Sequence, residues 1–220
     1  MTRQIKWLQD IPPHKLGVNQ RSYRISKRVM DLTITILALP FLVVVMLLTA
    51  LLIKLEDPRG PVFFFQLRTG KDGRRFKMYK FRSMVHNAEE LKKELAHMNE
   101  LLWPDFKITN DPRITRVGRF LRKTSLDELP QMINVLRGEM SLVGPRPTSF
   151  SAETYELWQT ERLDVIPGLT GLWQILGRSS IEFCERVCLD ILYIERRSLK
   201  LDLLILTHTF LAVVKQRGAY

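Results

Sequence analysis

The sequence has few residues that could form a disulfide framework or a metal cluster. It contains two cysteines, Cys184 and Cys188, which stand four positions apart, and four histidines that are scattered along the chain. No second group of cysteine or histidine completes a zinc site, and no histidine stands at ligand or triad spacing. We therefore expect the two cysteines to form a buried pair on one helix.

Motifs for nucleotides and nucleic acids are also missing. The chain has no GxxxxGK[ST] phosphate loop and no protein-kinase signature, so a phosphate donor would not be held in a P-loop. It shows no recognised nucleic-acid module. Internal repeats, low-complexity tracts and linkers between soluble domains are absent as well.

The composition points to an anionic partner. Among the 220 residues, 34 Lys and Arg stand against 23 Asp and Glu, and the formal net charge is +11. Apolar residues make up 45% of the chain, which excludes a disordered protein. The basic surplus favours binding to nucleic acid, to a phosphorylated ligand or to an anionic membrane surface.

Residues 32–53, LTITILALPFLVVVMLLTALLI, form the one long run without charge. About 20 apolar residues in a helix can cross the hydrocarbon core of a bilayer. The run starts too late for a typical signal peptide, and no cleavage site follows it. A soluble helix of this length would normally show a polar stripe, so we prefer a membrane segment to the alternative, a buried core helix.

Basic residues flank this run on both sides, and Pro40 lies within it. A simple crossing would place one basic flank outside the cell, although Lys and Arg favour the cytoplasmic side. Pro40 lacks a backbone donor and clashes with the carbonyl four residues back, so a bend there would return both flanks to one face. We favour this re-entrant hairpin over a tilted, kinked span, although the bend leaves a free carbonyl that needs a partner in lipid. The flanking basic residues are Lys15, Arg21, Arg24, Lys27 and Arg28 before the run, and Lys54, Arg59, Arg68, Lys71, Arg74 and Arg75 after it.

From residue 55 the pattern predicts a mostly helical α+β domain. Residues 61–84 read as two short strands around the turn signal TGKDG. Apolar spacing predicts a helix over 86–102. Further helices are expected at the end of 109–123, over 126–136, over 181–198 and over 199–216, whereas 167–180 is glycine-rich and irregular or strand-like. The last helix could lie on the membrane surface or in the core.

The stretch SLDEL, residues 125–129, allows two interpretations. Ser125 and Glu128 have the spacing of a capping box, and Asp127 would lie in the first helical turn, where acidic residues favour the helix dipole. This accounts for both acids without any chemistry. A second interpretation adds chemistry to the same capped helix start, whose anion-binding end would present Asp127 to a phosphate among arginines.

Cations in rigid surroundings favour the second interpretation. Arg146 lies between two prolines, and Arg178 follows a glycine. Guanidinium groups provide a planar fork of donors that suits phosphate. Several cations would lower the pKa of Asp127, which could then ligate a metal or attack as a nucleophile in phosphoryl transfer. The candidate cations are Lys80, Arg82, Arg122, Lys123, Arg146 and Arg178.

Three blocks of the sequence resemble a known family. They are FRSM at 81–84, the long block DPRITRVGRFLRKTSLDELPQMINVLRGEMSLVGPRP at 111–147, and PGLTGLWQILGR at 167–178. Together they resemble the bacterial sugar transferases, the monotopic phosphoglycosyl transferases that act on polyprenol phosphate. The resemblance runs from about residue 22 to the end of the chain, and its middle block is highly specific.

The resemblance implies an activity and a set of site residues. Such enzymes move a sugar 1-phosphate from a UDP-sugar to undecaprenyl phosphate and release UMP, with Mg²⁺, as the initiating step of exopolysaccharide, O-antigen or other glycan assembly. By resemblance Asp127 is the nucleophile and a magnesium ligand, and Glu128 assists as a base or by orienting the metal. The positions that match the family's phosphate-handling residues are Lys80, Arg122, Arg146 and Arg178, with Arg82 as a weaker candidate.

The resemblance also implies an organisation of the chain. We expect a basic segment (1–31), a re-entrant membrane helix broken at Pro40 (32–54) and a catalytic domain (55–220) at the cytoplasmic face of the bacterial inner membrane. Leu39 stands where many relatives have serine, which weakens the bend. The single apolar run corresponds to the short form of the family.

The expected partners are a UDP-sugar, undecaprenyl phosphate and membrane lipid, without nucleic acid. Oligomeric state is left open, with a homodimer as one option. The sugar is also open, and we would look for its determinants in LLWPDF, residues 101–106, and in the C-terminal loop. The competing hypothesis is a membrane-tethered basic protein that binds anionic lipid or nucleic acid.

Overall fold

The structure, a computed structural model, describes residues 20–100, 108–177 and 182–214. The described chain is mostly helical, with two small two-stranded sheets, which confirms the predicted class. The α-helices are α2 (Gln20–Glu56), α3 (Ala88–Glu94), α4 (Arg116–Thr124), α5 (Gln131–Arg137), α6 (Leu172–Leu176), α7 (Phe183–Arg196) and α8 (Leu199–Val214). The strands are β1 (Phe63–Thr69), β2 (Arg75–Phe81), β3 (Ser141–Val143) and β4 (Gly168–Thr170). Short 3₁₀ turns are η1 (Lys71–Gly73), η2 (Leu95–Met98), η3 (Leu126–Glu128), η4 (Ala152–Thr154) and η5 (Leu157–Leu163).

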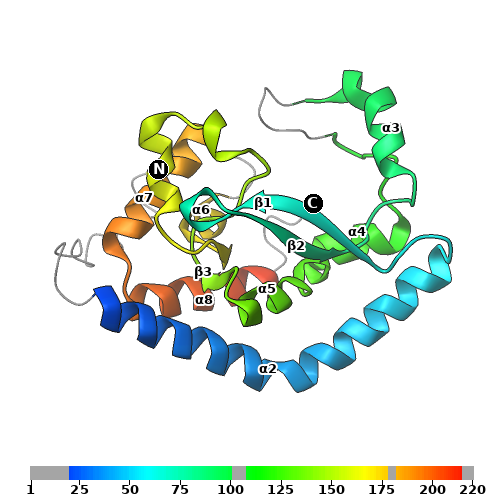
Figure 1. Ribbon diagram of the computed structural model, residues 1–220. Helices are drawn as coiled ribbons and strands as arrows, with labels where there is room; N and C mark the ends of the chain where they lie inside the picture. The colour runs from blue at the N-terminus through cyan, green and yellow to red at the C-terminus, as the bar shows by residue number, and fades with distance from the viewer. Residues whose placement is uncertain (1–19, 101–107, 178–181, 215–220) are drawn as a thin grey trace.

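Helix α2 contains the apolar run and extends beyond both of its ends. Figure 1 shows it beneath the rest of the fold as two arms that meet at an angle near the middle, and the helix continues through Pro40. Residues of one face are buried against the domain, whereas most large apolar side chains on the other faces are exposed. Within the described chain α2 is the one helix long and apolar enough to cross a membrane. The exposed side chains include Ile36, Leu37, Phe41, Val44, Leu47, Leu48, Leu51 and Leu55.

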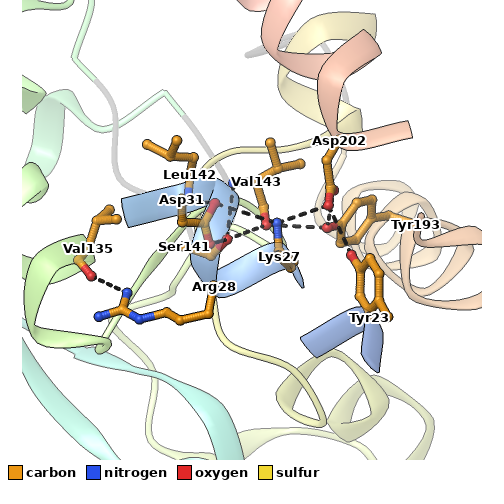
Figure 2. Close-up of polar contacts among 10 residues, drawn as sticks. All are labelled: Tyr23, Lys27, Arg28, Asp31, Val135, Ser141, Leu142, Val143, Tyr193 and Asp202. Atoms are coloured by element: carbon orange, nitrogen blue, oxygen red, sulfur yellow. Dashed lines mark hydrogen bonds and ion pairs between the residues drawn. The ribbon is translucent and has the colours of Figure 1, made fainter. Parts of the chain in front are cut away.

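The first arm of α2 is attached to the domain by polar contacts (Figure 2). Lys27 Nζ donates to Asp202 Oδ2 of α8 at 3.1 Å, and Ser141 Oγ of β3 donates to Asp31 Oδ2 at 2.7 Å. Arg28 donates to two carbonyls near the end of α5 at 2.5 and 2.8 Å. These contacts hold the start of the helix against β3, α5 and α8.

The second arm of α2 is attached to the same domain at a different place. Ile53 packs in a small core with Phe81 of β2 and Leu121 of α4. The carboxylate of Glu56 accepts hydrogen bonds from the first two backbone N–H groups of α4 at 2.8 and 3.0 Å. Both ends of the long helix therefore contact one folded body.

Strands β1 and β2 form the predicted hairpin. They pair antiparallel through η1, where Asp72 and Gly73 adopt positive φ angles of 55° and 73°. Along β2, Met78 belongs to the main core, and Phe81 belongs to the second core with Ile53. Lys80 lies between these two core residues in the sequence and is itself partly buried. The buried residues of the main core are Met78, Val135, Met140, Leu142, Val143, Leu172, Leu189, Tyr193, Leu201 and Ile205.

The helix predicted over 126–136 is wrong in its first part. Residues Leu126–Glu128 form the 3₁₀ turn η3, and α5 starts only at Gln131. Pro130 explains the division, because in an α-helix its ring would clash with the carbonyl of Leu126, four residues back.

Other elements differ from prediction in length or exposure. The helix predicted over 86–102 is shorter, consisting of α3 and η2, and it has no buried residue in its described part. The stretch 167–177 combines β4 with the short helix α6, and β4 pairs in parallel with β3, a strand that the sequence did not predict. Helices α7 and α8 were predicted correctly.

The prediction of a buried cysteine pair is also wrong. Cys184 and Cys188 do lie on one helix, α7, but both are free and exposed. The inward face of α7 is formed instead by Val187, Asp190 and Tyr193. Helical spacing placed the cysteines on a common face without determining which face packs inward.

Candidate active site

The acidic pair lies in the turn between α4 and α5. Ser125 ends α4 in the left-handed conformation, with φ 59°, and the chain then forms η3, which contains Asp127 and Glu128. The predicted capping box is wrong, because Ser125 makes no side-chain capping bond and Glu128 is directed elsewhere. The reversal at Ser125 turns η3 toward β2.

Glu128 binds two of the predicted cations. Lys80 Nζ of β2 donates to Glu128 Oε1 at 2.8 Å, and Arg146 Nη1 donates to Oε2 at 3.2 Å. Arg146 Nη2 makes a second contact with the same carboxylate. Burial by itself would raise the pKa of Glu128, but Arg146 and Lys80 together hold it well below its usual range. Glu128 is therefore a fixed anion that holds two cations in place.

Asp127 lies beside this cluster without belonging to it. The residue is 8% exposed, and Lys80 Nζ is 3.8 Å from Asp127 Oδ2. Among the described residues its carboxylate accepts no hydrogen bond. Burial raises the pKa of Asp127, and the negative charge of Glu128 adds to the rise, although Lys80 and Arg122 oppose it. The prediction of a lowered pKa is therefore wrong, because burial raises the pKa of Asp127 by more than the neighbouring cations lower it.

Arg122 reaches the site from the last turn of α4. Gly118 allows α4 to approach closely, because a Cβ there would lie 2.0 Å from the carbonyl oxygen of Ser83. Arg122 Nε then donates to Ser83 Oγ at 2.9 Å. Burial lowers the pKa of Arg122, although the charge of Asp127 opposes the shift. The structure therefore brings together Asp127, Glu128, Lys80, Arg122 and Arg146.

Arg82 is not part of this group. It is buried and donates from Nη1 to Asp57 Oδ2 at 2.8 Å and from Nη2 to the Asp57 carbonyl at 2.5 Å. Its guanidinium holds the chain just after α2. Arg178 and the segment 101–106 lie outside the described residues, so their predicted roles stay predictions.

Two further arginines lie at the site that the sequence analysis did not single out. Arg68 of β1 donates to the carbonyl of Pro147 at 3.4 Å, and burial together with the charge of Arg146 lowers its pKa to about 10. Arg162 of η5 donates to the carbonyl of Arg146 at 2.8 Å. Neither has a glycine or proline frame around it, so no local signal distinguished them.

The carboxylates of the site fit a magnesium ion better than a metal that needs a full set of protein ligands. Among the described residues no group of three His, Cys, Asp or Glu is placed to hold an ion. Mg²⁺ does not need such a cage, because it keeps several waters and binds through one or two carboxylates plus phosphate oxygens. Asp127, whose carboxylate accepts no hydrogen bond among the described residues and is 3.8 Å from Lys80 Nζ, is the residue that fits this role.

A buried carboxylate beside several cations can bind and react with a phosphate group. Lys80, Arg122 and Arg146 can offset the charge of a phosphate, and Asp127 can attack phosphorus or ligate a cation. In phosphoryl transfer the protein mainly positions groups and stabilises charge, which this arrangement allows.

Comparisons with known proteins found relatives that cover most of this chain. The sequence model of the bacterial sugar transferases matches residues 22–216. The galactosyl transferase CpsE of Streptococcus agalactiae is 45% identical over 90% of this chain and 44% of its own length. The undecaprenyl-phosphate galactose phosphotransferase of Salmonella typhimurium is 44% identical over 91% of this chain and 43% of its own. The exopolysaccharide production protein ExoY of Sinorhizobium fredii is 42% identical over 94% of both chains. The chain thus spans less than half of the first two relatives and nearly all of the third.

Proposed function

The chain belongs to the bacterial sugar transferase family, and from this membership we propose that it transfers a sugar 1-phosphate from a UDP-sugar to undecaprenyl phosphate. The observation that carries the proposal is the buried carboxylate of Asp127, which accepts no hydrogen bond among the described residues and lies beside the cluster of Lys80, Glu128 and Arg146. The names of the relatives support it, because one is a galactose phosphotransferase and another an N-acetylgalactosamine phosphotransferase acting on undecaprenyl phosphate.

In the first step an oxygen of Asp127 attacks the phosphorus that carries the sugar. A bond forms between the carboxylate oxygen and this phosphorus, and the bond to the bridging oxygen of the diphosphate breaks. UMP leaves with the bonding electrons, and the sugar phosphate remains as an acyl phosphate on Asp127. Lys80, Arg122 and Arg146 face the charge that develops on the phosphoryl oxygens.

In the second step a phosphate oxygen of undecaprenyl phosphate attacks the same phosphorus. The acyl phosphate bond breaks, the carboxylate of Asp127 is restored, and the product is undecaprenyl diphosphate sugar. The attacking phosphate is already ionised at neutral pH, so no strong base is required. Because the pKa of Glu128 is held low by Arg146 and Lys80, we infer that Glu128 orients these cations and does not serve as a base.

Mg²⁺ would be held by Asp127 and by the phosphates of the donor. When bound, it supplies charge neutralisation to the diphosphate.

We further propose that α2 enters one leaflet and returns, with the site at the cytoplasmic face. Support comes from its two ends, which contact one folded body through Asp31 and Lys27 on one arm and Ile53 and Glu56 on the other. A crossing helix would separate its ends by the hydrocarbon core, about 30 Å thick. The exposed apolar faces of α2 between these contacts would meet lipid.

The direct test measures UMP release by the purified chain in detergent or nanodiscs. The donors are UDP-glucose, UDP-galactose and their N-acetylated forms, each with undecaprenyl phosphate and Mg²⁺, and the Asp127→Asn variant is the blank. We expect release that requires the lipid phosphate and at least one donor. Absence of release with every donor, together with tight binding to nucleic acid or anionic vesicles, would support the competing binding-protein hypothesis.

A further inference from the structure

The loop that carries Arg146 is held by its carbonyl groups. Pro145 and Pro147 have no backbone N–H, so this part of the loop acts mainly as an acceptor. Four consecutive carbonyls each receive one donor, and these donors come from three segments of the chain, namely β1, η5 and β4. The bonds run from Gly168 N to Pro145 O at 2.9 Å, from Arg162 Nη2 to Arg146 O at 2.8 Å, from Arg68 Nη1 to Pro147 O at 3.4 Å and from Thr69 N to Thr148 O at 2.9 Å.

The donor to the carbonyl of Arg146 is itself half of a buried ion pair. Arg162 is 5% exposed, and the same Nη2 atom that binds the Arg146 carbonyl also lies 2.6 Å from Asp190 Oδ2. Asp190, on α7, is 1% exposed. A continuous chain of contacts therefore runs from Asp190 through Arg162 and the backbone of Arg146 to Glu128.

Stability alone gives a poor reason for this pair. Burying two charges costs free energy that the attraction between them often fails to recover, and well-packed apolar residues would serve as well. Within the described chain Asp190 Oδ1 is buried and has no hydrogen-bond partner, so the carboxylate is only half satisfied. What the pair does provide is a fixed donor at the backbone of Arg146.

We propose that Asp190 and Arg162 are positioning residues, which hold the Arg146 loop so that the guanidinium of Arg146 meets Glu128 and the substrate phosphate. The proposal rests on the proposed function in one respect, namely that Arg146 handles phosphate. Neither Asp190 nor Arg162 touches the reacting atoms. Their effect on the reaction passes through Arg146.

The charges around Asp190 are few. Arg162 faces it from η5 and Arg186 from the preceding turn of α7, while α6, which packs against α7, carries no titratable side chain. Burial raises the pKa of Asp190 to about 6, although both arginines oppose the rise. Protonation of Asp190 below this pH removes the ionic partner of Arg162 and should loosen its hold on the loop.

The first test compares the pH dependence of wild type and Asp190→Asn. At pH 7.5 we expect the variant to lose at least tenfold in kcat for UMP release. Because asparagine resembles the protonated acid, the ratio of wild-type to variant kcat should fall toward one below about pH 6. Taking the ratio cancels the titration of Asp127, which is common to both proteins. A ratio that stays near one at pH 7.5, or that does not change with pH, would overturn the proposal.

A double-mutant cycle tests the route through Arg146. In an Arg146→Lys background, Asp190→Asn should cost less than threefold, because the contact that it positions is already impaired. Asp111→Asn is the matched control: it also breaks a buried pair, with Arg113 at 2.6 Å, but Arg113 reaches the carbonyl of Ala88 and not the loop. The control should combine additively with Arg146→Lys. Additive behaviour of Asp190→Asn would contradict the proposal.

A third measurement does not depend on activity. The backbone N–H groups of Thr69, Gly144 and Gly168 bond to or from the loop and its flanks, so their hydrogen exchange reports how firmly the loop is held. We expect at least tenfold faster exchange at these positions in Asp190→Asn, and no change in Asp111→Asn. If Asp190→Asn does not fold, Arg162→Lys replaces it, since lysine keeps a charge opposite Asp190 but lacks the planar guanidinium whose Nη2 atom contacts both acceptors. If wild type releases no UMP, the proposed function fails and exchange alone decides this inference; unchanged exchange would reject it.

Discussion

Replacing Arg146 by lysine keeps the charge of this site and removes its geometry. Arg146 contacts both oxygens of Glu128 through two nitrogen atoms, and Nη1 also lies 3.4 Å from the carbonyl of Leu169. A lysine presents one compact ammonium group on a flexible stem. It can keep one contact with Glu128 but cannot reproduce the fork.

The expected loss of activity in Arg146→Lys follows from the one charged hydrogen bond that lysine cannot make. A hydrogen bond between charged groups is worth ~1.5–3 kcal/mol. If this contact serves the transition state, its loss lowers kcat/KM by about 10- to 150-fold. The fold should be retained, because Lys80 still neutralises Glu128 at 2.8 Å.

The assay is UMP release at several UDP-sugar concentrations, with thermal denaturation to verify folding. Arg119→Lys is the control, because Arg119 lies on the exposed side of α4, and its kcat/KM should stay within about twofold of wild type. If Arg146→Lys stays within about threefold of wild type, a difference below ~1 kcal/mol, Arg146 is not a phosphate clamp.

Three other predictions concern separate features. Asp127→Asn should abolish UMP release with little change in thermal midpoint, since the carboxylate accepts no hydrogen bond in the described chain; near wild-type rates would remove its role as nucleophile. In cells whose native cysteines are replaced, Thr2→Cys and Ala219→Cys should both resist an impermeant thiol reagent until detergent opens the membrane, and labelling of Thr2→Cys from outside would show that α2 crosses it. The pKa of Asp190 is raised by burial from 3.8 to about 6, so the folded state retains this proton where the unfolded chain has lost it. The contribution of Asp190 to the free energy of unfolding is complete below about pH 4 and falls by ~3 kcal/mol as pH rises through 6. In thermal denaturation, Asp190→Asn should lack this dependence of stability on pH. An equal dependence in both proteins would contradict the assignment.

The site could be predicted from sequence only in part. Local pattern indicated the hairpin of β1 and β2, and resemblance supplied Asp127, Glu128, Lys80 and Arg146, which the structure places together. The resemblance ranked Arg82 below Lys80, but spacing alone could not separate them, because both stand on the same side of an extended strand. Strand β2 ends at Phe81, and the guanidinium beyond it turns to Asp57.

The capping box failed for a related reason. The spacing of Ser125 and Glu128 is a local signal, and it assumes that no distant group competes for the carboxylate. Lys80 and Arg146, which are 48 and 18 residues away, bind Glu128 more strongly than a backbone N–H at its own helix start would. The direction of the pKa shift of Asp127 was likewise beyond reach, since it depends on burial and on how the cations are shared.

The sequence by itself determined the long apolar helix, the hairpin, the last two helices and the family, because periodicity, turn residues and long motifs are properties of adjacent residues. Only the tertiary structure decided which face of α7 is buried, which of the two acids accepts the hydrogen bonds of Lys80 and Arg146, and which donor holds the loop of Arg146. These outcomes depend on segments far apart in the chain, such as Asp190 and Arg146, whose contact through Arg162 no local pattern encodes. Burial and partner choice are set by packing, and packing exists only once the whole chain has folded.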